Sequence, residues 1–291
     1  MATLRFEPEL VQAVTDAELE HARRAGDVTL LQQYHAGAEP LYKMFEQERE
    51  KAFARFHSTW FFERGWTNLF VETWNEFPEL DARAPHLLVL AARLKREEGA
   101  VIGRDGVSVC LRVLPLRFAN RERLLAFVRH EFLHAADMLD AHFGYQTLGE
   151  ATLAETNRLA DSYHALWCAY VDARLERRHL APLMDYHAHH NVFQSQFSSP
   201  TEQRDALLTQ VWNASALAHN EIISLARANS PRGTRHNGAR CPLCHFPTFQ
   251  WASEIAPVVA DAIRADFPAW QIDDGACERC VERYAMLVPV E

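Results

Sequence analysis

One segment constrains the fold of this chain more than any other, residues 120–144, because a helical pattern there carries the letters HEFLH. Asn120 is a suitable N-cap and Gly144 a suitable stop, so we expect a helix between them. His130 and His134 lie four residues apart, and this spacing puts both side chains on one face of a helix. Two imidazoles arranged in this way can bind one Zn²⁺ ion, each at ~2.0–2.1 Å.

The residues around the two histidines are typical of a helix that is buried in a folded domain. Glu131 follows the first histidine and can act as a general base toward a water molecule on a metal held there. The positions that must pack into a core are uncharged, whereas Arg129, on the remaining free position, is charged. These core positions are Phe127, Val128, Phe132, Leu133, Ala135 and Ala136.

With these flanks the HEFLH segment resembles the zincin metallopeptidases, over roughly residues 85–180. The resemblance implies that His130 and His134 bind a catalytic zinc ion and that Glu131 is the catalytic base. It also implies cleavage of a peptide or protein substrate. Zinc would activate water and polarise the scissile carbonyl, and Glu131 would pass a proton to the leaving amine.

A catalytic zinc site needs a third protein ligand, and the sequence leaves several candidates. The gluzincin arrangement takes this ligand, usually a glutamate, from the next helix, expected here over roughly residues 153–178. At a rise of ~1.5 Å per residue, residues 162–172 of an antiparallel helix come level with the histidines. We predict Asp172, because a carboxylate within the apolar run WCAYVDARL needs a metal, an arginine such as Arg174 or a hydrogen-bond donor. The alternatives are His164, Asp161, Glu155, Glu176 and, in a metzincin-like arrangement, Asp140.

Other polar residues have candidate roles around such a site. Asp137, one turn after His134, is expected to accept a hydrogen bond from a ligand histidine, the alternative being a solvated surface charge. The letters HAHH at 187–190 suggest a metal site, but three histidines in a loop are also typical of a polar loop. The group that stabilises the oxyanion stays open among His187, His189, His190, Tyr163 and Tyr170.

Four of the six cysteines form two CxxC pairs, Cys241 with Cys244 and Cys277 with Cys280. Each pair can supply two thiolates at ~2.3 Å, so together they predict a closed four-cysteine site for a structural Zn²⁺ ion in a zinc ribbon. The 32 residues between the pairs exceed the usual spacer, and a helix over residues 253–267 accounts for the excess. His245 is a candidate for a competing ligand. The single cysteines, Cys110 and Cys168, are expected to be small core residues.

The spacing of apolar residues predicts a mostly helical α+β fold. Residues 8–55 and 201–228 have helical spacing. The runs 86–94 and 107–118 are short, apolar and β-branched, and the segment between them has the Gly and Asp content of turns. We therefore expect a small antiparallel sheet ahead of the HEFLH helix.

Length and composition set the number of domains. At 291 residues the chain is long enough for about two domains. The polar segment 229–240 is the expected linker between a helical zincin-like domain, residues 1–228, and the zinc-ribbon module, residues 241–291.

Charge and hydropathy restrict the partners and the location. The net charge of −9, from 30 basic and 39 acidic residues, argues against a nucleic-acid partner. No apolar run reaches the ~18 residues of a membrane-spanning helix. The N-terminus lacks the pattern of a secretory signal, so we expect a cytoplasmic protein.

Two alternative functions stay open. The chain could be a non-catalytic zinc-binding scaffold, or a partner-binding protein, with a degenerate zincin fold. Alternatively, a zincin domain followed by a zinc ribbon is similar, in the order of its modules, to the SprT-like proteases that act on DNA–protein crosslinks. The ribbon itself is expected to stabilise the fold or to dock a protein partner.

Overall fold

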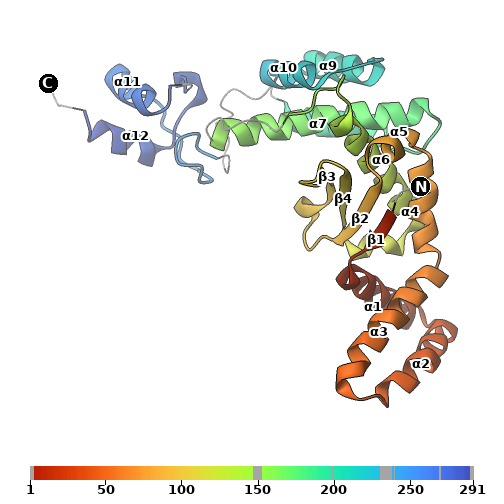
Figure 1. The fold of residues 1–291 in the computed structure, drawn as a ribbon. Helices are drawn as coiled ribbons and strands as arrows, with labels where there is room; N and C mark the ends of the chain where they lie inside the picture. Colours follow the sequence, from red (N-terminus) through yellow and green to blue (C-terminus); the bar gives the residue numbers. More distant parts are fainter. Residues whose placement is uncertain are drawn as a thin grey trace. The chain divides into compact units, whose positions relative to one another are not determined.

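The computed structural model describes residues 3–146, 153–197, 199–229, 238, 240–268 and 270–288, with the backbone alone for residues 153–158 and 273. These residues form twelve α-helices and a four-stranded sheet (Figure 1). The fold is therefore α+β and mostly helical, as expected. The chain divides into two compact units, residues 1–145 with 171–183 and residues 146–170 with 184–291.

The first unit begins with a strand and five helices. They are β1 (Thr3–Phe6), α1 (Pro8–Ala25), α2 (Val28–Tyr42), α3 (Glu46–Glu63), α4 (Trp66–Asn75) and α5 (Pro78–Arg83). The helical structure expected over residues 8–55 is confirmed, and local signals divide it into three helices. Gly26 adopts a left-handed φ of 71° that ends α1. The side chain of Asp27 then accepts a hydrogen bond from Leu30 N at 3.0 Å and caps α2.

The sheet is mixed, and the antiparallel sheet expected from the two apolar runs is wrong. Its remaining strands are β2 (His86–Ala91), β3 (Gly99–Ile102) and β4 (Ser108–Val113), in the order β1-β2-β4-β3. β1 with β2 and β2 with β4 are parallel pairs, whereas β3 and β4 are antiparallel. The segment with the composition of turns forms β3, which reverses the chain before β4 and so lets β4 run in the direction of β2.

The two faces of this sheet differ in burial. Leu87, Val89, Val109 and Leu111 point to one face and are at most 2% exposed. The alternate positions are partly buried or exposed, and Arg112 and Val101 are among the exposed ones. The strand β3 is at an edge of the sheet.

Helix α6 (Arg121–Leu139) carries the HEFLH segment, follows a short 3₁₀ helix, η2 (Pro115–Ala119), and packs against β3. The side chain of Asn120 accepts a hydrogen bond from Arg123 N at 2.9 Å, so the predicted N-cap is confirmed. The helix ends before Gly144. All six core positions named from the sequence are buried, and Arg129 is bound by both carboxylate oxygens of Glu76, at 2.6 and 2.7 Å.

Helix α7 (Leu153–Arg177) confirms the helix expected after α6 and contributes to both units. In the second unit it is followed by α8 (Tyr186–Gln196), α9 (Thr201–Asn213) and α10 (His219–Asn229). The letters HAHH lie in α8, so the loop expected there is wrong. Asp185 caps this helix by accepting a hydrogen bond from Ala188 N at 2.7 Å. Residues 201–228, expected as one helical segment, form the two helices α9 and α10.

The cysteine-containing part of the second unit has an apolar core of its own. It contains α11 (Pro257–Asp266), a short 3₁₀ helix η3 (Ile272–Asp274) and α12 (Glu278–Ala285). The helix expected within residues 253–267 is therefore confirmed. Leu243, Val259, Ile263 and Trp270 are buried around the cysteines.

Two further predictions concern the linker and membrane-spanning helices. Most of the expected linker, residues 230–237 and 239, lies outside the described residues. No helix among the described residues is long and apolar enough to cross a membrane.

Candidate metal centres

The two histidines of the HEFLH segment face each other on α6. Both side chains are buried, and the Nε2 atoms of His130 and His134 are 3.0 Å apart. A tetrahedral ion bound at ~2.0–2.1 Å holds two nitrogen ligands ~3.3 Å apart. The observed separation is close to this value, so the pair fits a shared metal ion.

Asp172 contacts His130 from the other side of the imidazole ring. This carboxylate is fully buried on α7, and its Oδ1 lies 2.8 Å from Nδ1 of His130. The same oxygen accepts a hydrogen bond from Leu183 N at 2.9 Å. The structure thus brings Asp172 to the site, but against the nitrogen that faces away from His134. A carboxylate in this position orients a ligand histidine and fixes its tautomer.

Asp137 is also buried, 5% exposed, and therefore is not a solvated surface charge. It accepts a hydrogen bond from Arg174 Nη1 at 2.7 Å. From the sequence, Arg174 was a possible partner of Asp172. The structure shows that it contacts Asp137 on α6. The expected bond from Asp137 to a ligand histidine stays a prediction.

Glu131 lies between α6 and the edge strand β3. One of its carboxylate oxygens, Oε2, accepts a hydrogen bond from Ala100 N at 2.8 Å. Gly99 has a φ of +135°, which favours glycine, and a Cβ atom there would be in ordinary contact with Oε2 at 3.5 Å. The Glu131 carboxylate therefore lies against the backbone of the edge strand β3.

Cys168, expected to be a small core residue, is the third member of the group formed with His130 and His134. The sulfur of Cys168, one turn before Asp172 on α7, and one nitrogen of each histidine lie within 4.8 Å of one another. The sequence did contain a signal for Cys168. It lies four residues before Asp172, and this spacing puts both side chains on one face of the helix.

The other candidates for the third ligand have different surroundings. Asp140 accepts hydrogen bonds from Arg83 at 3.3 Å and from His142 N at 3.2 Å. Asp161, His164 and Glu176 are exposed. The side chain of Glu155 lies outside the described residues.

The candidates for the oxyanion-stabilising group have contacts within the second unit. Tyr163 Oη is 2.7 Å from Nδ1 of His219, and Tyr170 Oη accepts a hydrogen bond from Leu217 N at 3.1 Å. His190 Nε2 lies 2.9 Å from Asp205, its ring is stacked with that of His187, and His189 is buried. None of these contacts identifies the oxyanion-stabilising group.

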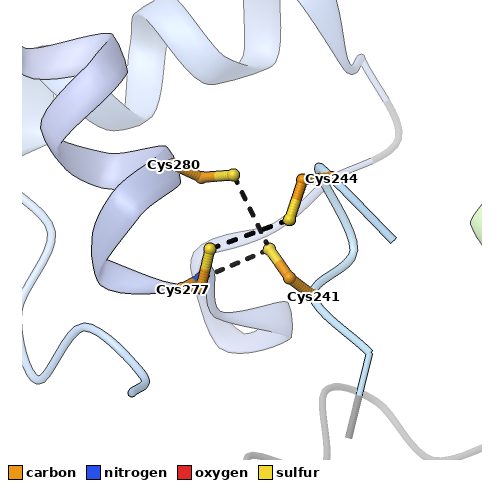
Figure 2. Close-up of side chains that lie close together, drawn as sticks. All are labelled: Cys241, Cys244, Cys277 and Cys280. Carbon is orange, nitrogen blue, oxygen red and sulfur yellow. Dashed lines mark hydrogen bonds between the residues drawn. The ribbon is translucent and has the colours of Figure 1, made fainter. Parts of the chain in front are cut away.

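The four cysteines of the CxxC pairs converge on one point (Figure 2). Their sulfurs all lie within 4.8 Å of one another, with Cys241 3.9 Å from Cys280 and Cys244 3.8 Å from Cys277. A tetrahedral zinc ion bound at ~2.3 Å holds its sulfur ligands ~3.8 Å apart. All four cysteines are free, so the group fits a metal ion rather than a pair of disulfides. This ligand group does not include His245.

Backbone N–H groups favour the thiolate form of one of these cysteines, Cys241. Burial raises the pKa of Cys241, but N–H donors from Cys277, Cys244 and Leu243 outweigh this effect, and the net pKa is lowered. Cys277 N donates to the sulfur of Cys241 at 3.3 Å. The pKa of Cys280 is raised, first by burial and then by the charge of Cys241. A cation among the sulfurs removes this mutual repulsion, because it binds thiolates.

No known protein family, curated protein or solved structure matches this chain. Two candidate metal sites, one of four cysteines and one of two histidines with a cysteine, are thus the features that indicate its function.

Proposed function

We propose that this protein is a zinc-dependent peptidase with a second, structural zinc ion in its cysteine-containing part. One observation carries the proposal. On the buried helix α6, two imidazole nitrogens lie 3.0 Å apart, and the carboxylate between them in the sequence contacts the edge strand of the sheet. Metal ligands, an acidic side chain and a strand edge are the parts that peptide hydrolysis at a metal needs.

Each residue of this group has a distinct task in the proposal. His130 and His134 hold the ion through Nε2, and Asp172 keeps His130 in that orientation through Nδ1. Cys168 is the further donor whose distance suits the ion. A bound zinc ion supplies a Lewis acid that lowers the pKa of water and polarises a carbonyl. Glu131 accepts a proton on its carboxylate and returns it to the leaving amine.

Substitution of the base separates metal binding from hydrolysis. The wild type is expected to hold two zinc ions per chain. Glu131→Gln keeps both ions but lowers peptide hydrolysis by about 10²–10⁴-fold, because an amide cannot take the proton. His130→Ala is the matched control on the same helix and holds only one ion. Metal analysis of the purified chains and cleavage of a peptide panel measure both effects. A wild type with a single ion would contradict the proposal.

A non-catalytic zinc-binding scaffold is the second candidate function. The observation that favours it is the hydrogen bond from Ala100 N to Glu131 Oε2, because this bond occupies an oxygen that the base needs. Two zinc ions per chain with no cleavage of any peptide in the panel would support the scaffold over the peptidase.

A further inference from the structure

Two histidines of the HAHH segment lie together on α8, and neither candidate metal centre includes them. His187 and His190 are three residues apart, so they share one face of the helix. Their ring planes are 7° apart and their ring centroids are 6.3 Å apart. His187 is exposed, and the side chain of His190 is 33% exposed. An ion in solution can therefore reach both imidazoles.

A carboxylate on the next helix contacts one of these imidazoles. Oδ1 of Asp205, on α9, lies 2.9 Å from Nε2 of His190, and the side chain of Asp205 is 46% exposed. Gln194, one turn after His190 on α8, donates a hydrogen bond to the same oxygen at 2.9 Å. The two helices pack against each other. Two imidazoles and a carboxylate are ligand types that bind divalent transition-metal ions.

The charge of Asp205 lacks a basic partner. Among the described residues, no arginine or lysine forms an ion pair with it. Arg204, its neighbour in the sequence, donates instead to the backbone oxygens of Gln194 and Phe197. In the same part of the chain, Oδ2 of Asp205 accepts no hydrogen bond and keeps its lone pairs. These features favour a cation beside this carboxylate.

The distances are near those that a bound ion requires. A tetrahedral zinc ion bound at ~2.0–2.2 Å holds a nitrogen and an oxygen ligand ~3.4 Å apart, so His190 and Asp205 need to separate only slightly. Residues three apart on a helix have Cβ atoms ~5–6 Å apart, less than the 6.3 Å between the two ring centroids. Rotation of the exposed His187 side chain toward His190 therefore brings the rings closer. The rings of His130 and His134, by comparison, have centroids 4.7 Å apart.

We propose that His187, His190 and Asp205 bind a third metal ion, a divalent transition-metal ion that links α8 to α9. Gln194 holds the carboxylate in place through its amide. The inference does not depend on the proposed peptidase, because none of these residues belongs to the peptidase site. The ligands are partly exposed and must close around the ion, so we expect a lower affinity than at the two buried centres. A chain purified without added metal then keeps two ions and binds the third on titration.

Zinc titration of the full chain, without an affinity tag and with both buried centres loaded, tests this site. Calorimetry should show that the wild type binds one further ion per chain. His187→Ala and Asp205→Asn should each lower the affinity for this ion at least tenfold, because loss of even an outer-shell partner costs about 10–100-fold. His142→Ala is the matched control and should keep the wild-type affinity. It disrupts another exposed histidine–aspartate pair, in which Nδ1 lies 3.4 Å from Asp140.

Amide exchange measures the link between the two helices. Zinc should slow exchange in α8 and α9 of the wild type, because an ion that binds only the folded helices stabilises them. Asp205→Asn should lose most of this effect while exchange without added zinc stays close to that of the wild type.

Three results would overturn the inference. They are a wild type that binds no third ion, a third ion whose affinity is unchanged in His187→Ala or in Asp205→Asn, and uptake that leaves exchange in α8 and α9 unaltered. The absence of peptide cleavage would count against the proposed function alone.

Discussion

The carboxylate of Asp172 decides which nitrogen of His130 is left for a metal. Its Oδ1 is held between Nδ1 of His130 and the backbone N–H of Leu183, at 2.8 and 2.9 Å. The carboxylate is fully buried, so these two contacts help to hold the oxygen in place. Because Nδ1 is occupied in this way, Nε2 faces His134. A residue that orients a ligand should change the affinity for the metal without removing the site.

Replacing Asp172 by Asn therefore tests its role. Asn keeps the shape but loses the charge that polarises the imidazole, and we expect zinc affinity at the histidine pair to fall about 10–100-fold. Competition with a chelating dye measures this affinity, and the ion bound by the four cysteines is an internal control. Asp140→Asn, at the end of α6, should leave the affinity unchanged. Complete loss of the histidine-bound ion in Asp172→Asn would instead identify Asp172 as a ligand.

At the scale of elements, α6 could be predicted because its signals are local. Asn120 supplies the cap and the apolar spacing supplies the buried face, and both belong to one continuous segment. The sheet could not be predicted in the same way. β1 is only four residues long, and its pairing with β2 joins residues far apart in the sequence. The order of strands depends on packing between such segments, which the pattern of one segment does not contain.

The contact between α2 and α3 should depend on pH. His57 of α3 is buried, and its Nε2 lies 3.0 Å from the hydroxyl of Tyr34 on α2. Burial lowers the pKa of His57 below its ordinary value of 6.5, and the charge of Asp16 opposes this only in part. The unfolded chain therefore binds more protons just below pH 6.5. The contribution of neutral His57 to the free energy of unfolding is therefore complete above that pH. It is lost as the pH falls toward the lowered pKa.

Urea unfolding followed by tryptophan fluorescence at about pH 7.5 and pH 5.5 measures this loss. Wild type should unfold at a lower urea concentration at the acid pH, and His57→Gln should show a smaller difference between the two conditions. His35→Gln removes an exposed histidine of α2 and should behave as wild type. An equal pH effect in wild type and His57→Gln would show that another group titrates.

At the scale of the whole molecule, the two metal sites differ in how far the sequence reveals them. The ligands of the four-cysteine site lie in two short motifs, so their residue types and spacing identify them directly. The histidine site joins α6 to α7, and the contact of Asp172 with Nδ1 depends on how these helices pack. The nearness of Cys168 has the same origin. Residue spacing suggests which side chains share a helix face but not which atom of each reaches the site.

Removal of the cysteine-bound ion should affect one part of the molecule. The apolar core of residues 240–288 is built around Cys241, Cys277 and Cys280, all buried, so loss of the ion leaves clustered thiols in that core. Cys277→Ser is expected to lose one zinc ion and amide-exchange protection in α11 and α12, because a structural zinc site contributes folding free energy. Protection in α6 and in β2 and β4 should persist, together with the histidine-bound ion. Cys110→Ser, which changes a cysteine outside both ligand groups, is the control and should keep both ions. Retained protection of α11 and α12 in Cys277→Ser would mean that the apolar core holds this part together without its metal.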